Sequence, residues 1–346
     1  MVKNELDKKI DREEKGGKLN VLIMEGLAIF FVMLVHSGTP NYIYSFFSYG
    51  LSSLIFARGY QWKEKSLDKF ILSRIQLIKT YYFAGLINSL IFLLIVPEKF
   101  ITTSRWKYLV NFLIGKLDKL SEIPINIVPL WFFLMLFFAE IFYLILSKNK
   151  ITIYIAIVLS IFIRIIPHTP LPFKIDAALC SIPFFYIGKK WKEMNMKISS
   201  PFFLLSTFGL FLVSRYNGDI SWNTQWFGKN GLIAFLGEIL AIFVVIYLSE
   251  FIKNSVFEGF FYKLAFNSLF VISYHFLFGS ILYYPFSLLL GPIENPMELL
   301  HKFWFIHFAA VIVIVLLSIK FIPRKIRSFL IGNFNDFTKR KGRRSV

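Results

Sequence analysis

Long apolar runs, repeated along almost the whole chain, are the feature that most limits how this protein can fold. Phenylalanine, isoleucine and leucine fill most of these runs, and 42 of the 346 residues are phenylalanine. A helix needs roughly 20 mainly apolar residues to cross the hydrocarbon core of a bilayer. Hydrophobic residues make up 56% of the chain and charged residues only 17%, which excludes an ordinary soluble domain. The sequence therefore predicts an all-α integral membrane protein.

About ten transmembrane helices in a single bundle are expected from the positions of these runs. The expected spans are Asn20 to His36, Tyr42 to Ala57, Leu77 to Val96, Ile127 to Leu146, Ile151 to Ile166, Ile175 to Gly188, Pro201 to Ser214, Leu232 to Ile252, Ala265 to Leu290 and Phe303 to Ile322. Residues 106–115 are apolar on one side but too short to cross, which favours an interfacial helix. No internal repeat is visible, so residues 20–322 form one transmembrane domain between an N-terminal tail, 1–19, and a basic C-terminal tail, 323–346.

Lysines and arginines gather in alternate loops, and this bias sets the orientation of a membrane protein. The loops at 58–74, 148–150 and 189–197 and both tails are basic, whereas the loop at 37–41 has no basic residue and that at 291–300 has only acidic charges. The mixed loop at 97–126 is the exception. Both termini are therefore expected on the cytoplasmic side of the cell membrane. The first 18 residues are polar, so no signal peptide is expected.

The formal net charge of +18 does not indicate a nucleic-acid partner. Its basic residues flank apolar runs and form no stripe with interleaved aromatic residues, which favours contact with anionic membrane lipid. The single cysteine, Cys180, lies in an apolar stretch. It excludes a disulfide framework and a cysteine-based metal site, and we interpret it as a buried structural thiol.

Ionisable residues inside the expected spans are functional candidates, because charge is costly at membrane depth. These residues are Glu25, His36, Glu140, Arg164, Asp176, Glu238, His275 and His307. The eleven residues from Glu25 to His36 span about 16 Å and nearly three full turns, so both side chains fall on one face. The three histidines are expected in the outer half of the bundle. Structural alternatives remain open: Glu140 and Glu238 can pair with Arg164 or with backbone donors, and His307 can serve a helix interface.

A basic cluster lies around the start of the third expected span, with Arg58, Arg74 and Lys79 among its members. Such a cluster is usually a topology signal. Its density at a helix start also suits a ligand rich in phosphate groups.

Several short stretches occur in an order that resembles acyltransferase family 3, the multi-span membrane enzymes that acylate cell-surface sugars. Residues 26–36 resemble the family's first helix, in which a Gly-Leu-Ala run leads to a histidine, here His36, at the outer end. Residues 54–60 resemble the end of its second helix, and residues 70–82 resemble the basic start of its third helix. Residues 130–133 resemble its Leu-Trp-Phe-Leu signature, and residues 182–188 resemble its Pro-Phe-Phe-x-x-Gly helix. Residues 267–275 resemble the late Asn-Ser-Leu stretch ending in histidine, particularly that of the fucose 4-O-acetylase-like branch. The similarity covers about residues 20 to 320.

The chain also departs from the family pattern at charged positions. Glu25 stands where the family usually has arginine or lysine, and Arg58 stands where it has serine. Arg74 matches the first of two arginines in the third helix, but Leu77 occupies the second position and Lys79 follows two residues later.

The resemblance implies transfer of an acyl group, expected to be acetyl, from cytoplasmic acyl-CoA to a hydroxyl of an extracytoplasmic carbohydrate or lipid-linked glycan. Acyl-CoA is then a donor substrate, and no permanently bound cofactor or metal is expected. The expected catalytic residues are His36, as general base or transient acyl carrier, His275, which orients it or stabilises an oxyanion, and Glu25 on the same face as His36. The expected substrate contacts are Arg58, Arg74 and Lys79 to the CoA phosphates and Trp131 to a sugar ring.

Three other functions remain open. A transporter or flippase of lipid-linked sugars also needs polar residues inside a bundle, although the paired, interrupted helices typical of transporters are not visible here. A glycan polymerase would use a lipid-linked donor and would not need the basic cluster. A family member without catalytic activity is the third alternative, and Glu25 is the residue that most favours it.

Overall fold

The computed structural model describes residues 20–95, 105–118, 125–290 and 301–334. All regular secondary structure in these ranges is helical, and the one β-type pairing there is an isolated bridge between Ser221 and Trp226. The expected all-α class is confirmed for this part of the chain. The N-terminal tail, the acidic loop at 291–300 and the end of the C-terminal tail from 335 onward lie outside the described residues.

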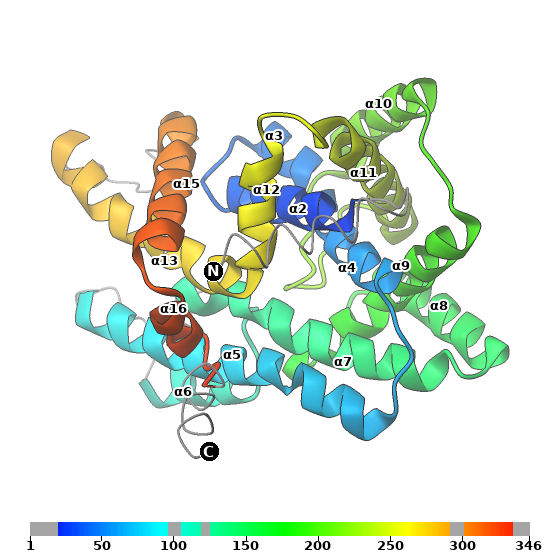
Figure 1. Ribbon diagram of the computed structural model, residues 1–346, viewed down its shortest axis with the longest axis horizontal. Coiled ribbons are helices and arrows are strands. Elements are labelled where there is room, and N and C mark those ends of the chain that lie inside the picture. Colours follow the sequence, from blue (N-terminus) through cyan, green and yellow to red (C-terminus); the bar gives the residue numbers. More distant parts are fainter. Residues whose placement is uncertain (1–19, 96–104, 119–124, 291–300, 335–346) are drawn as a thin grey trace, which may run out of the picture.

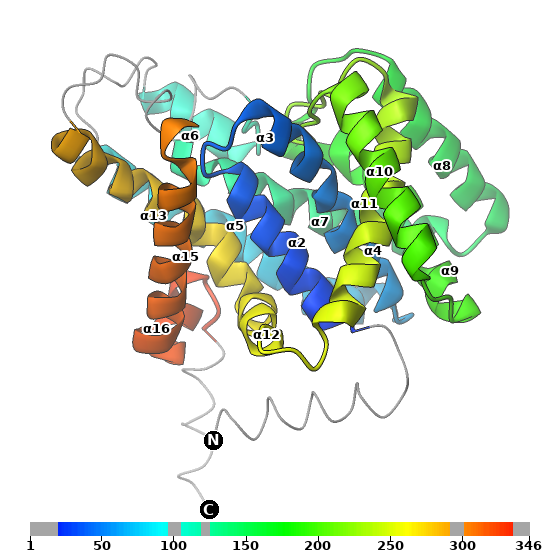
Figure 2. The same cartoon turned by 90° about the horizontal axis from the view of Figure 1, so that it is seen from above.

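The helices surround α2, which lies between α13 and α15 on one side and α10 and α11 on the other (Figures 1 and 2). At one end of the bundle lie α3 and α6, and at the other end lie α12 and α16 (Figure 2). In chain order the elements are α2 (Val21–Val35), α3 (Asn41–Ser48), η1 (Tyr49–Leu51), α4 (Ser52–Tyr60), α5 (Leu67–Ile95), α6 (Arg105–Leu113), η4 (Ile125–Leu130), α7 (Trp131–Leu146), α8 (Lys150–Ile165), η5 (Pro172–Lys174), α9 (Ile175–Met194), α10 (Ser200–Asn217), α11 (Gly231–Ile252), α12 (Glu258–Phe266), α13 (Ser268–Leu290), α15 (Trp304–Phe321) and α16 (Arg324–Leu330).

Three described helical segments are long and apolar enough to cross a membrane. They are Ile127–Leu146, Gly231–Ile252 and Trp304–Phe321. The α12 and α13 helices are bent by 92° relative to each other, and together they make a fourth segment if they count as one broken span. The chain is therefore a membrane protein with several apolar helices.

One of the expected spans is broken in the structure, and another contains a 3-10 turn. Residues 42–57 fall in α3, η1 and α4 without a gap, and after the 3-10 turn the hydroxyl of Ser52 donates to the carbonyls of Tyr49 (2.9 Å) and Glu238 (3.2 Å). Residues 265–290 are divided at Asn267, whose amide donates to the carbonyl of Lys263 (2.7 Å). Serine and asparagine side chains compete in this way with backbone donors for carbonyl groups, which favours irregular helix geometry at both places.

Exposed apolar faces cover the outside of the bundle. In α8, Leu159 and Phe162 are 50% and 54% exposed, while Ser160 and Arg164 of the same helix are buried. A helix with its apolar face outward and its polar face inward is suited to lipid and not to water. These faces agree with the membrane class that composition predicts.

Glycine permits the close packing of α4 against α9. A side chain added at Gly59 would collide with the backbone of Phe185, and one added at Gly188 would collide with the backbone of Phe56. Small residues at such a crossing let two helix backbones approach closely, as is common between membrane helices. This crossing fixes α4, which bears Arg58, within the bundle.

Candidate functional site

Two histidines from distant parts of the chain meet inside the bundle. His36 ends α2, and its Nδ1 atom lies 2.9 Å from Nε2 of His275 in α13. Nδ1 of His275 lies 3.0 Å from the carbonyl of Val271, one turn earlier in the same helix. His275 is only 2% exposed, whereas His36 is half-buried. The structure therefore brings the two predicted histidines into direct contact.

The hydrogen-bond pattern determines which nitrogen carries the proton in each neutral ring. The Val271 carbonyl can only accept, so His275 donates to it through Nδ1–H and keeps a lone pair on Nε2. That lone pair accepts the Nδ1–H of His36. The remaining lone pair of His36 is then on Nε2, and it can take a proton from a neighbouring hydroxyl.

A cavity of about 410 Å³, here named the histidine cavity, opens beside His36. Its volume falls in the range of small-molecule sites in proteins. Trp131, the first residue of α7, lines the cavity, and its expected contact with a sugar ring stays a prediction. The loop between α10 and α11 supplies polar lining residues, namely Asp219, Ser221, Asn223 and Thr224.

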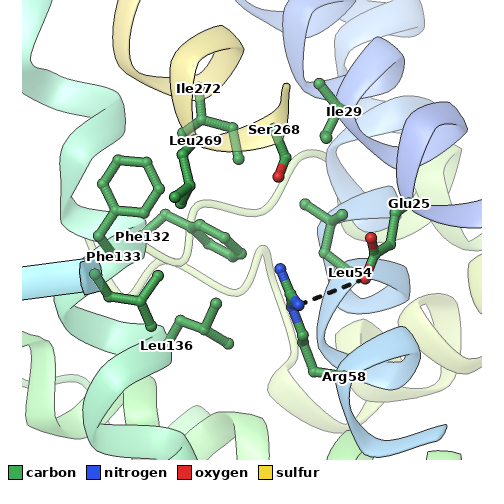
Figure 3. Close-up of a pocket in the computed structure, with 11 residues that line it drawn as sticks. Glu25, Ile29, Leu54, Arg58, Phe132, Phe133, Leu136, Ser268, Leu269 and Ile272 are labelled. Atoms are coloured by element: carbon green, nitrogen blue, oxygen red, sulfur yellow. Dashed lines mark ion pairs between the residues drawn. The ribbon is translucent and has the colours of Figure 1, made fainter. Parts of the chain in front are cut away.

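A second, smaller cavity of about 20 Å³, here named the arginine cavity, has Glu25 and Arg58 in its wall. Nη1 of Arg58 lies 3.8 Å from Oε1 of Glu25, and Gln61 donates to the same oxygen at 3.3 Å. Figure 3 shows the two charged side chains opposite the apolar groups of Phe132 and Leu136. Arg58 therefore does supply a positive group next to Glu25.

The two cavities adjoin each other. Leu54, Phe132 and Ile272 line both of them. Glu25 lies early in α2 and lines the arginine cavity, while His36 ends the same helix and lines the histidine cavity. The interior side of α2 thus connects a charged group at one end with an imidazole pair at the other, as the spacing of these residues predicts.

The basic cluster is divided in the structure. Nε of Arg74 lies 2.5 Å from Oε2 of the buried Glu140, and Arg74 also interacts electrostatically with Arg58 and Glu25. Arg58, Arg74, Glu25 and Glu140 therefore form one charge-balanced group. Lys79 is exposed on α5 and is absent from the lining of both cavities. The structure therefore brings Arg58 and Arg74 together, whereas Lys79 lines neither cavity.

The other polar candidates lie in separate contacts. Arg164 pairs with Glu238 at 2.5 Å, and both side chains are completely buried, which confirms that expected pair. Glu140 pairs with Arg74 and not with Arg164, because the guanidinium of Arg164 forms its ion pair with Glu238 of α11. Nε2 of His307 lies 3.1 Å from the Gly279 carbonyl, which is the helix-interface contact named above as an alternative role for this residue.

Sequence reasoning missed the acidic and amide groups of the histidine cavity. Asp118 and Asp219 both line it, as do Asn223 and Tyr44. The signal that could have found them is the polar and tryptophan-rich stretch at 217–230, which interrupts two apolar runs. Asp118 follows the expected interfacial helix, and that segment gave no reason to place it near His36.

No protein-family model, no curated protein and no solved structure matches the chain. Among the described residues, no group of three or more His, Cys, Asp or Glu side chains is arranged to hold a metal ion.

Proposed function

We propose that this protein is a membrane O-acyltransferase of the acyltransferase family 3 type. In this proposal the chain crosses the cell membrane about ten times with both termini in the cytoplasm. It transfers an acyl group, expected to be acetyl, from cytoplasmic acyl-CoA to a hydroxyl of a carbohydrate or lipid-linked glycan at the outer face. Acyl-CoA acts as a substrate, and no permanently bound cofactor is required.

The adjoining cavities along α2 are the observation that carries this proposal. Arg58 lies at one end, where a guanidinium group suits a phosphate-rich donor, and His36 lies at the other. With the N-terminus inside, α2 runs outward, so the Arg58 end is cytoplasmic and the His36 end is external. A thioester arm entering beside Arg58 would then approach a hydroxyl held beside His36.

The chemistry follows from the lone pair on Nε2 of His36. The acceptor hydroxyl gives its proton to Nε2 while its oxygen attacks the carbonyl carbon of the thioester. A new C–O bond forms, the C–S bond breaks, and the CoA thiolate leaves with the electron pair. The protonated His36 then returns its proton to the thiolate, which leaves the histidine neutral again.

His275 has a positioning role in this scheme. Its Nε2 accepts the Nδ1–H of His36 at 2.9 Å, and this contact holds the ring of His36 in the tautomer that keeps Nε2 free. When His36 is protonated, the same bond gains charge assistance and stabilises the imidazolium. Trp131 is assigned to stack on the sugar ring, and Arg74 supports Arg58 in donor binding.

A transporter of lipid-linked sugars is the second candidate, and the break between α12 and α13 favours it. Interrupted helices near a central path are typical of transporters. A transporter would not need His36 to carry out chemistry, so replacement of this residue separates the two functions.

Mass spectrometry of surface glycans from cells with the native gene, without it, or with His36→Ala tests the proposal. We expect an acetyl mass increment in the native cells alone, with His307→Ala as the control that retains the increment. A full acetyl increment in cells that carry His36→Ala at native abundance would contradict the proposed chemistry.

A further inference from the structure

The charge balance of the histidine cavity indicates what kind of acceptor it can hold. The cavity has two carboxylates, Asp118 and Asp219, in its lining, and no lysine or arginine is among the described residues that line it. An acidic lining disfavours an anionic ligand, because like charges repel strongly where water is partly excluded.

Asp118 already has a partner behind the cavity wall. Its Oδ1 lies 3.7 Å from Nζ of Lys174, and Lys174 also donates to the Asn223 carbonyl at 2.8 Å. Burial lowers the pKa of Lys174 to about 8, while Asp118 opposes that shift. Lys174 is fully buried at the start of α9 and is held by these contacts, so it is not free to reach a ligand.

Asp219 has no such partner among the residues that the structure describes. It is half-buried in the loop after α10 and makes no ion pair with a described side chain. It interacts electrostatically with Tyr44, which also lines the cavity. Within the described part of the chain, the Asp219 carboxylate is therefore not balanced by a cation.

Asn223 fixes part of the cavity wall. Its side-chain amide donates to the Leu117 carbonyl at 2.6 Å, which orients the group. Its Oδ1 has no hydrogen-bond partner within the described part of the chain, although Asn223 is only 7% exposed. Because this oxygen has less than 1 Å² of accessible surface, it does not face the open part of the cavity, and the amide serves to hold the wall in place.

From these observations we infer that the histidine cavity binds an acceptor carrying a protonated amine, such as an amino-sugar unit, with Asp219 as its counter-charge. An ammonium group has three donors and no acceptor, which matches the Asp219 carboxylate, for which the described residues supply no cation. Trp131 and Trp226 also line the cavity, and indole rings are the side chains that attract cations most strongly. This inference rests on the proposed function in that the hydroxyl beside the amine is the group presented to His36.

A binding experiment that needs no acyl-CoA tests the inference separately from the reaction. Purified protein in lipid nanodiscs is titrated with methyl glucosaminide, methyl glucoside and methyl glucuronide at slightly acidic pH, and tryptophan fluorescence reports occupancy. We expect the glucosaminide to bind about tenfold more tightly than the glucoside, and the glucuronide to bind most weakly. Asp219→Asn should reduce glucosaminide affinity to the glucoside level, whereas Asp219→Glu should retain the preference.

Glu193→Gln is the matched control, because it removes one carboxylate from an exposed position paired with Lys190. It should leave all three affinities unchanged. Equal affinities for the three sugars, a preference for the glucuronide, or an Asp219→Asn variant with native preference would each overturn the inference. Acetyl transfer from acetyl-CoA is then measured on the same samples. The predicted order of binding without any transfer would support the acceptor inference and contradict the proposed function.

Discussion

At the scale of single residues, the contact between His36 and His275 is the feature on which the proposed chemistry depends. The sequence predicted both residues, because an imidazole in an apolar helix is rare enough to be noticed. It did not predict their hydrogen bond, since 239 positions separate them along the chain. Asp219 was missed for a related reason: a carboxylate in a polar loop is not unusual until the fold places it in a cavity.

Replacing His275 tests its positioning role. His275→Ala removes the acceptor for the Nδ1–H of His36, and we expect the rate of acyl transfer to fall at least tenfold with little change in the KM for acyl-CoA. His275→Gln places an amide oxygen near the lost nitrogen and should restore part of the rate. The rate and its pH profile are measured for both variants. An unchanged profile in His275→Ala would show that the residue has only a packing role.

Glu25 tests the donor site at the same scale. Its carboxylate lies 3.8 Å from Arg58 and competes with any phosphate group for that guanidinium. Glu25→Gln removes the competing charge and keeps the shape, so CoA should bind more tightly, by about three- to tenfold. Isothermal titration with CoA measures this change. Weaker CoA binding in Glu25→Gln would mean that Arg58 needs Glu25 to hold it in place and does not bind the donor as proposed.

At the scale of elements, the long apolar segments were predictable and their interruptions were not. The stretches at 127–146 and 231–252 fall on helices close to their expected bounds, because length and hydropathy determine them. The 3-10 turn at η1 and the break at Asn267 occur beside side-chain hydrogen bonds to carbonyl groups, one of which is the distant Glu238 carbonyl. Apolar composition cannot reveal contacts of that kind.

The α4 and α9 crossing gives a prediction about packing. Gly59→Ala places a methyl group against the backbone of Phe185, and we expect a loss of about 1 to 3 kcal/mol in stability. Gly259→Ala in α12 is the matched control, because nothing lies within 4 Å of the added carbon. Thermal unfolding in the same detergent compares the two variants. Equal melting temperatures would show that this crossing tolerates a larger separation.

At the scale of the whole molecule, the distribution of basic loops predicts the orientation. The native cysteine, Cys180, is buried and should not react with a labelling reagent. Labelling of a single introduced cysteine can therefore be detected without a contribution from Cys180. Tyr42→Cys, at an exposed position in α3, should react with a membrane-impermeant maleimide on intact cells. Lys190→Cys, at the other end of the bundle, should react only after the cells are opened. Labelling of Lys190→Cys in intact cells would contradict the orientation with both termini inside.

The central claim is that the acyl group passes from a donor on one face to an acceptor on the other through the cavities beside α2. Proteoliposomes with a single protein orientation test it most directly, with radiolabelled acetyl-CoA supplied only on the cytoplasmic face and methyl glucosaminide only on the opposite face. We predict labelled acetyl ester on the sugar with the native protein. His36→Ala should lower the rate by about two to four orders of magnitude, the usual scale for a positioned base, while His307→Ala keeps it. Ester formation at the native rate in His36→Ala, or only when both substrates share one face, would contradict the account.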